Sequence, residues 1–393
     1  MEKRRLGAQD AAKGLMIIGV IFFHSFMMTL ANPSDVINTF NPLVLCFPFL
    51  LSTFFFYAGY NYVPSEKTYG QHIARRAKQL LIPMAIAFVV SSLLISAMEL
   101  AFHANEAGAT FRDIGNSILY SLMSEPLAWM IGFPKEGGLI FELYLSLSLL
   151  WFLYALFICS LFFYLLVKFT NQKLWVFLVT VLGLLALAFC LGQFVGVYLP
   201  YTVQCYPVIL AIMLTGAYLR KFDFLEREVK SKKDIALHGL FALLCEGAIV
   251  GIGLLCYCQW GAIGVGSLPG GKFDGTIKGF DAFIAFSFGI LGTFFLHTLC
   301  RALIRIPLFG KAIQWVGQHS AFFYLFHPIF LELVGIAFFQ KRILWGIGQA
   351  FFYVAVVVLL LTGVCLLIDL LKKKKRPTPA DEPQKEGEEA PHE

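Results

Sequence analysis

Charged side chains are scarce in this chain. Asp, Glu, Lys and Arg together make up 14% of its 393 residues, whereas a soluble domain carries about 25%. Hydrophobic residues make up 58%, and the mean hydropathy is +0.73. The scarcity of charge excludes an ordinary water-soluble globular domain. Apolar runs long enough to cross a bilayer recur along the sequence, and only helices satisfy their own backbone hydrogen bonds in lipid. We therefore predict an all-α, polytopic integral membrane protein.

Two further absences narrow the class of protein. The short alternating segments of a membrane β-barrel are missing, and the nine cysteines form no Cys-x-x-Cys motif. Most cysteines lie inside apolar segments, where they are expected to pack as small core residues. The Cys256-x-Cys258 pair is weak evidence for metal or redox chemistry. We predict no metal site and expect no nucleic-acid partner.

The apolar runs predict about ten transmembrane helices, at 13–31, 42–63, 80–98, 143–167, 174–192, 201–219, 235–257, 280–300, 313–336 and 346–369. If the N-terminus is cytoplasmic, the inner segments contain 24 Lys and Arg residues besides Lys13, and the outer segments contain 6. This bias follows the positive-inside rule. We therefore predict a multi-pass protein of the plasma membrane with both termini in the cytoplasm. The first run lacks a small-x-small cleavage site, so we expect it to be retained as a span rather than removed as a signal peptide.

Residues 1–371 are predicted to form one transmembrane domain, followed by a cytoplasmic tail, 372–393. The tail opens with four lysines and an arginine and continues with Pro, Glu and Gln, a composition typical of disorder. Two predicted outer segments stand out. Residues 99–142 contain the apolar patch Leu119–Phe133, which fits a re-entrant piece or an ordinary mobile loop. Residues 258–279 are glycine-rich and indicate an exposed loop.

A histidine stands in the middle of the first apolar run, eleven residues after Lys13. Eleven residues turn an α-helix through about 1100°, or ~20° past three full turns, so Lys13 and His24 share one face. If the hydrocarbon begins near Leu15, His24 lies about 14 Å deep, close to the middle of a ~30 Å core. An ionisable side chain at that depth is costly and usually faces a cavity or a partner. One interpretation is a core histidine bonded to a neighbouring helix; the other is a catalytic group.

Three other stretches carry polar groups at helix spacings. Arg75, Arg76 and Lys78 stand at the predicted inner mouth of the third span, where they also act as a topology signal. In the second span, Gly59 within Phe-Phe-Tyr-Ala-Gly-Tyr allows close helix packing. On the ninth span, spacings of four and seven place Ser320, Tyr324 and His327 on one face. Two histidine-bearing stripes on different spans suggest a lined cavity, although one stripe alone fits interhelical packing.

Together these stretches resemble the acyltransferase-3 family of integral-membrane O-acyltransferases. The resemblance is carried, in order, by Asp10-Ala-Ala-Lys13-Gly-Leu leading to His24 in an Arg/Lys-x10-His pattern, Phe55-Phe-Tyr-Ala-Gly-Tyr60, Arg75-Arg-x-Lys-x-Leu-Leu-Ile-Pro83, Leu150-Trp-Phe-Leu153 and Ser320-x-x-x-Tyr-Leu-x-His327. It covers the whole ten-span chain. Two positions depart from the family pattern. Ala58 stands where Ser is frequent, and Lys78 replaces the second arginine of an Arg-x-x-Arg pair, keeping the charge without the bidentate fork.

The resemblance implies an acyl-CoA donor in the cytoplasm, with acetyl-CoA as the expected donor, and an acceptor hydroxyl on a sugar, cell-surface glycan or lipid-linked molecule. On this reading, the cations Lys13, Arg75, Arg76 and Lys78 bind the CoA phosphates. His24 removes the acceptor's proton or briefly carries the acyl group. His327, Tyr324 and Ser320 orient the acceptor or stabilise the thioester oxyanion.

Other functions also fit a membrane protein with buried ionisable residues. Glu246 and Glu332 lie within apolar segments and are candidate functional groups. A secondary transporter of a small polar metabolite or lipid-linked sugar is the main alternative, and it needs the Arg75–Lys78 cluster only for topology. A purely structural scaffold leaves His24 unexplained.

Overall fold

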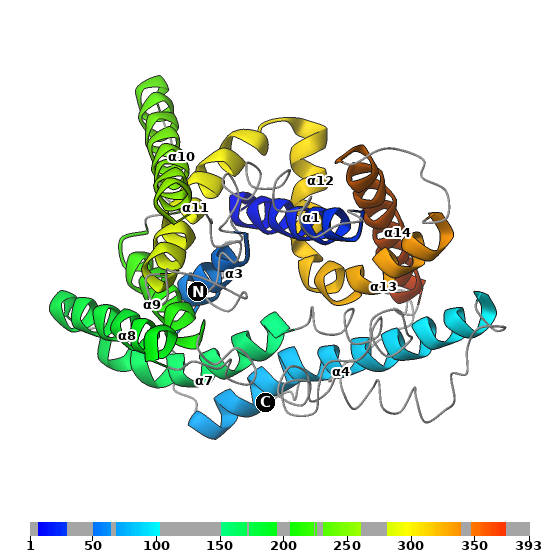
Figure 1. Ribbon diagram of the computed structural model, residues 1–393, viewed down its shortest axis with the longest axis horizontal. Coiled ribbons are helices and arrows are strands. Elements are labelled where there is room, and N and C mark those ends of the chain that lie inside the picture. The colour runs from blue at the N-terminus through cyan, green and yellow to red at the C-terminus, as the bar shows by residue number, and fades with distance from the viewer. Residues whose placement is uncertain are drawn as a thin grey trace, which may run out of the picture.

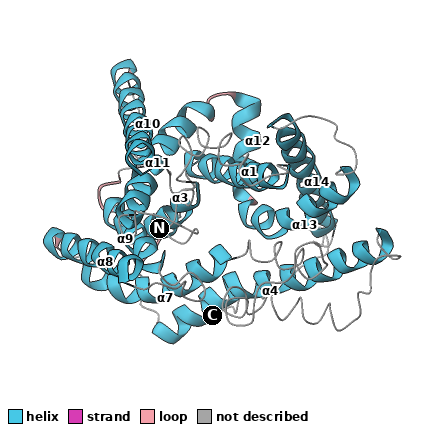
Figure 2. Ribbon diagram, viewed as in Figure 1, coloured by secondary structure: helices cyan, strands magenta, loops and turns pink. Residues whose placement is uncertain are grey.

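The computed structural model describes residues 7–29, 50–63, 68–102, 151–170, 173–194, 205–223, 225, 231–260, 281–338 and 347–374. Every regular element in these ranges is an α-helix, as predicted (Figures 1 and 2). The helices are α1 (Gly7–Thr29), α3 (Leu50–Tyr60), α4 (Tyr69–Phe102), α7 (Trp151–Thr170), α8 (Leu174–Phe194), α9 (Tyr206–Arg220), α10 (Lys232–Trp260), α11 (Asp281–Leu303), α12 (Pro307–Gln318), α13 (Ser320–Phe338) and α14 (Ile347–Lys374).

Each of the ten predicted spans overlaps at least one of these helices. Five helices are long and apolar enough to cross a membrane by length and composition, namely α7, α8, α10, α11 and α14. The helices α3, α9 and α13 are apolar but shorter. The described part of the chain is thus all-helical and has several candidate membrane spans, whereas the count of ten and the orientation remain predictions.

Helix α1 lies at the centre of the bundle. It packs most extensively against α12 and α14 and also contacts α11, α13 and α3. Figure 1 shows it between the α3–α11 group and the α13–α14 pair. Central placement suits a helix that carries a histidine, because its polar group then faces protein rather than lipid.

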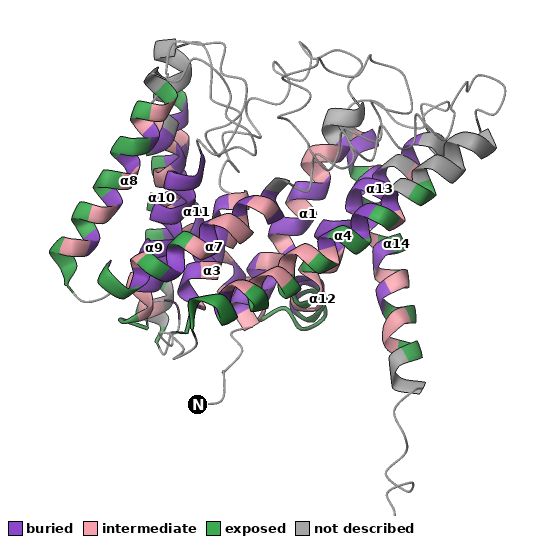
Figure 3. Cartoon of the chain, turned by 90° about the horizontal axis from the view of Figure 1, so that it is seen from below, coloured by how far each residue is buried: buried purple, intermediate pink, exposed green. Residues whose placement is uncertain are grey.

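Helices α8 and α10 lie at the edge of the bundle. Among the major packing interfaces of the described helices, α10 contacts only α11. Both helices expose leucines along their outer sides, including Leu182 at 59% and Leu243 at 70% exposure (Figure 3). Exposed leucine rows are expected where a helix faces hydrocarbon rather than water, because lipid removes the cost of exposing apolar surface.

Glycines bring two pairs of helices into close contact. A Cβ atom added at Gly59 of α3 would lie 1.9 Å from the Met213 carbonyl oxygen of α9, and one at Gly216 would lie 2.3 Å from that of Phe56. Likewise, a Cβ atom at Gly317 of α12 would lie 1.6 Å from the Asp10 carbonyl oxygen of α1. The backbones touch at both crossings, so the prediction that Gly59 allows close packing is confirmed.

Substituting Gly59 by alanine is therefore expected to destabilise the protein by roughly 1–3 kcal/mol, the usual cost of overpacking a core. Gly183 on α8 is the matched control, because nothing lies within 4 Å of a Cβ atom placed there. Gly183→Ala should be neutral or stabilising, since alanine is the better helix former by about 1 kcal/mol. Thermal unfolding of both variants in detergent measures the difference in stability. Equal unfolding temperatures would show that the α3–α9 contact accommodates the added methyl group without loss of stability.

The predicted ninth span is divided into two helices. The structure places the break at His319, between α12 and α13, and begins α12 at Pro307. Proline suits the first helical position because its missing N–H would have no helical partner there. The His319 Nδ1–H donates to the Trp315 carbonyl at 2.9 Å, and the centroids of the two rings lie 4.3 Å apart with the ring planes tilted by 34°. Hydropathy did not reveal the division, because α12 buries its own apolar face beside α1.

Several predicted features lie outside the described residues. These are residues 103–142 of the first outer segment with its Leu119–Phe133 patch, residues 261–279 of the second, and the tail beyond Lys374. The side chain of Glu332 is also outside the described set. Of the described cysteines, five are buried as expected for core residues, and Cys190 is exposed.

Candidate active site

Two histidines from distant parts of the chain meet inside the bundle. His24 Nδ1 of α1 lies 2.9 Å from His327 Nε2 of α13, across 303 residues of sequence. The rings are nearly parallel, with an interplanar angle of 9° and centroids 5.1 Å apart. His327 is fully buried and His24 is partly buried. The structure thus brings the two predicted histidine-bearing stripes together at these rings, and the lined cavity stays a prediction.

The hydrogen bonds around the pair define where the protons lie when both rings are neutral. His327 Nδ1 is 2.7 Å from the Tyr324 carbonyl oxygen, which can only accept, so Nδ1 carries the proton. The Nε2 of a neutral ring in that tautomer is an acceptor. It therefore accepts from His24 Nδ1–H, and the lone pair of His24 is on Nε2. A neutral imidazole with one nitrogen held and the other available is the arrangement expected of a general base.

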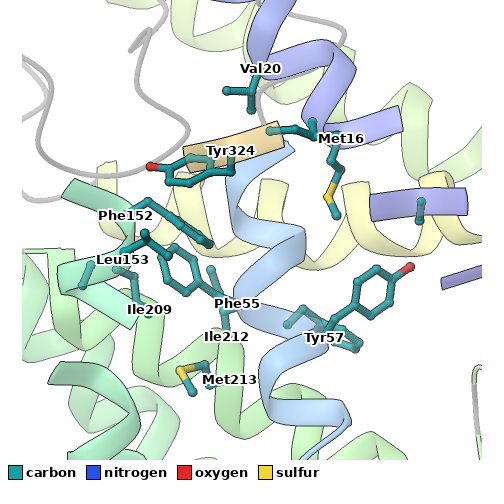
Figure 4. Close-up of a cluster of buried hydrophobic side chains, with 14 of the residues drawn as sticks. Met16, Val20, Phe55, Tyr57, Phe152, Leu153, Ile209, Ile212, Met213 and Tyr324 are labelled. Carbon is teal, nitrogen blue, oxygen red and sulfur yellow. The ribbon is translucent and has the colours of Figure 1, made fainter. Parts of the chain in front are cut away.

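Tyr324 and Ser320 lie on α13 with His327, but the two residues have different surroundings. The Tyr324 ring packs 5.2 Å from Phe152 of α7, which in turn packs 4.6 Å from Phe55 of α3 (Figure 4). The Tyr324 hydroxyl is hydrogen-bonded to the Phe152 backbone. Ser320 is the first residue of α13 and lies about 10 Å along the helix from His327, at ~1.5 Å per residue. Of the three stripe residues, His327 is the one whose hydrogen bond to His24 the structure shows.

The predicted donor-binding cations lie on two helices. Arg75, Arg76 and Lys78 are in the first turns of α4, where Arg75 and Lys78 are exposed and Arg76 is partly buried. Burial lowers the pKa of the Arg76 guanidinium from its ordinary value, and the positive charge of Arg75 lowers this pKa further. Lys13 lies on α1, where its Nζ is 3.6 Å from the buried Asp10 carboxylate. Helices α1 and α4 share no major packing interface among the described helices.

Sequence reasoning missed two further arginines near the α4 group. Arg220, at the end of α9, donates to the Tyr60 and Tyr62 carbonyls at 3.2 and 3.0 Å. Arg301, near the end of α11, donates to the Leu225 carbonyl, and the Leu225 N–H donates to the Tyr60 hydroxyl at 3.2 Å. Both arginines therefore lie around the carboxyl end of α3, where cations are favoured by the helix dipole.

These contacts place three predicted inner segments on one side of the bundle. Tyr62 interacts electrostatically with Arg76 of segment 64–79, and the two arginines belong to segments 220–234 and 301–312. The predicted topology requires these three segments to lie on the same side of the bundle, and these contacts agree with that requirement. A cluster of positive charges on one side of the bundle also suits an anionic ligand, because side chains from several helices can contact that ligand.

A third buried histidine was also missed. His297 of α11 donates from Nε2 to the Leu225 carbonyl at 3.1 Å, which leaves Nδ1 to accept the Tyr57 hydroxyl at 3.2 Å. Both ring nitrogens are thereby used in holding α3, α11 and Leu225 together. The signal was present in the sequence, since His297 is an ionisable residue in an apolar run, the same feature that identified His24.

Two other kinds of candidate site, a buried carboxylate and a metal centre, gain little support from the structure. One Glu246 carboxylate oxygen is buried and has no hydrogen-bond partner among the described residues. Within the same residues, no group of three or more His, Cys, Asp or Glu side chains is arranged to hold a metal ion.

The fold and this pair of histidines define a helical membrane protein with two hydrogen-bonded imidazoles in its interior. The particular family follows from comparison with known proteins. A family model described as an acyltransferase domain matches residues 7–369, so the chain belongs to the acyltransferase-3 family of membrane proteins. No curated protein and no solved structure matches the chain.

Proposed function

We propose that this protein is a membrane-embedded O-acyltransferase of the plasma membrane. It moves an acetyl group from cytoplasmic acetyl-CoA to a hydroxyl of a sugar, a cell-surface glycan or a lipid-linked acceptor. The observation that carries the proposal is the hydrogen-bonded pair of His24 and His327, which leaves the Nε2 lone pair of His24 available. Family membership supports the reaction class.

In the proposed reaction, His24 Nε2 takes the proton of the acceptor hydroxyl while the acceptor oxygen attacks the thioester carbonyl carbon. The new C–O bond forms, the C–S bond breaks, and the leaving thiolate takes the proton back from His24 as free CoA. His327 holds the imidazolium that forms between these steps, because its Nε2 accepts from His24 Nδ1–H throughout. Ser320 and Tyr324 keep their predicted role beside the acceptor and the oxyanion.

Phosphates of the donor are proposed to lie among the cations at the α4 end of the bundle. Arg75, Arg76 and Lys78 are assigned to the nucleotide end, and Arg220 and Arg301 extend the same positive region. Guanidinium groups suit this role because they form charge-assisted hydrogen bonds to phosphate. Lys13 is assigned to the same phosphates, and its spacing of eleven residues from His24 separates the phosphate contacts from the thioester.

The direct test uses the purified protein in lipid nanodiscs with labelled acetyl-CoA and a glycan or lipid-linked hydroxyl acceptor. Release of CoA with transfer of label to a hydroxylamine-sensitive ester on the acceptor is the expected result. Label that stays on the protein would identify His24 as an acyl carrier. Absence of CoA release across the acceptor panel, together with exchange of a polar solute across vesicles, would replace this proposal by the transporter.

The arginine assignment predicts a donor-specific defect. Arg76→Gln should raise the KM for acetyl-CoA by about 10-fold, since a charge-assisted hydrogen bond contributes roughly 1.5–3 kcal/mol and 1.4 kcal/mol is tenfold. The KM for S-acetylpantetheine, which has no nucleotide phosphates, should not change. Lys311→Gln is the matched control, because Lys311 is an exposed cation on α12. Steady-state kinetics at fixed salt measure both donors, and an equal defect with both would assign Arg76 a structural role.

A further inference from the structure

Pro328 directly follows the buried histidine of α13 and lies inside the helix. In an α-helix, the N–H of each residue donates to the carbonyl four residues earlier, and proline has no N–H. The carbonyl that loses its donor at Pro328 is that of Tyr324. The same oxygen accepts the hydrogen bond from His327 Nδ1 at 2.7 Å. The proline and the histidine therefore act on one backbone carbonyl.

We propose that Pro328 is a positioning residue that sets the tautomers of both histidines. It leaves the Tyr324 carbonyl to His327 Nδ1–H, which makes His327 Nε2 an acceptor. That acceptor holds the proton of His24 on Nδ1 at 2.9 Å and so directs the His24 lone pair to Nε2. The catalytic consequence rests on the proposed acyl transfer, whereas the tautomers themselves do not.

Replacing Pro328 by alanine restores the missing N–H. The new N–H donates to the Tyr324 carbonyl, and the clash between the proline ring and that carbonyl disappears, so the helix straightens. His327 Nδ1–H then shares the Tyr324 carbonyl with the backbone and keeps its smaller interaction with the Phe323 backbone, so the tautomer with the proton on Nε2 gains population. In the tautomer with the proton on Nε2, His327 no longer accepts from His24. The alanine helix is intrinsically more stable, since proline is the least favourable residue in a helix interior.

Pro328→Ala is therefore expected to have a higher unfolding temperature and a lower kcat. We expect kcat to fall by about 10-fold, the lower end for losing a group that orients a functional histidine, while the KM for acetyl-CoA stays the same. A purely structural role for Pro328 would move stability and activity in the same direction. The opposite movement of the two readouts separates positioning from packing.

The tautomers can be read without any substrate. Nitrogen NMR of histidine-labelled protein in nanodiscs distinguishes protonated from unprotonated ring nitrogens, and His24→Gln and His327→Gln variants assign the signals. The wild type should show the proton of both histidines on Nδ1, and Pro328→Ala should show a mixture at His327. Pro83→Ala on α4 is the matched control, because Pro83 also lies inside a helix. It should stabilise the protein and leave both histidine signals unchanged.

The outcomes separate this inference from the proposed function. Unchanged His327 signals and an unchanged kcat in Pro328→Ala would overturn the inference, even if the wild type transfers acetyl groups efficiently. The expected tautomers and their loss in Pro328→Ala would support it. If they occur in a protein that releases no CoA, the proposed function fails and the positioning by Pro328 stands.

Discussion

His24→Ala is expected to lower acyl transfer by at least ~100-fold, the low end for removing a general base. The lost group is the one that the pair presents with an available lone pair, so the variant lacks the proposed base. Folding should be nearly unaffected, because one hydrogen bond is lost and a costly polar group leaves the membrane interior. The measurement is CoA release from labelled acetyl-CoA under single-turnover conditions, with the amount of inserted protein determined in parallel.

A matched control for this experiment is His238→Ala. His238 lies on α10 at the edge of the bundle, where its Nδ1 bonds to the Asp234 carbonyl of its own helix at 2.7 Å. This variant removes a histidine from the membrane protein without touching the pair, so its rate should equal that of the wild type. A His24→Ala variant that is as active as His238→Ala would exclude His24 as base and as acyl carrier.

His327→Leu is expected to have the second largest effect, with a loss of roughly 100-fold in kcat, the upper end for removing a residue that orients a functional histidine. Leucine leaves the His24 Nδ1–H without an acceptor in a buried place, and an unsatisfied buried donor is expensive. The ring of His24 is then free to turn or to change tautomer. The KM for acetyl-CoA should stay near its original value, because the donor phosphates are assigned to the α4 cations rather than to this pair.

His327→Gln distinguishes orientation from direct chemistry. The glutamine amide oxygen can take the place of Nε2 as an acceptor for His24 Nδ1–H, although it cannot transfer protons as an imidazole does. If His327 only orients His24, the glutamine variant should recover most of the lost rate. A glutamine variant as inactive as His327→Leu would mean that His327 itself exchanges protons. In the double variant with His24→Ala, the losses should not add, since the two rings act as a unit.

The helical architecture and the two histidines could be predicted from the sequence because both depend on local rules. Apolar runs identify helices, and an ionisable residue in such a run is costly wherever the run is placed. Helix spacing located Ser320, Tyr324 and His327 on one face. It could not show that the Tyr324 hydroxyl bonds to the Phe152 backbone, since that contact depends on how α7 packs.

Other parts of the site could not be predicted because they depend on tertiary contacts. Arg220 resembled an ordinary inner cation in the sequence, and only the fold shows it at the end of α3. The break at His319 fell inside a single predicted span, although Gly317, Gln318, His319 and Ser320 interrupt the apolar residues there. The role of Pro328 needed a distance to a specific carbonyl, although proline inside a helix was visible in the sequence. In each case the residue is visible in the sequence, but the group that it contacts is determined by tertiary packing.

The sequence separation of His24 and His327 has a consequence for biosynthesis. The first histidine is made near the start of translation, and its partner follows 303 residues later. Until α13 is inserted beside α1, the nascent chain holds an early helix with an unpaired ring and no fixed proton. The proposed catalytic pair therefore cannot form until α13 has been made, so the order of synthesis keeps the two histidines apart until most of the described helices exist.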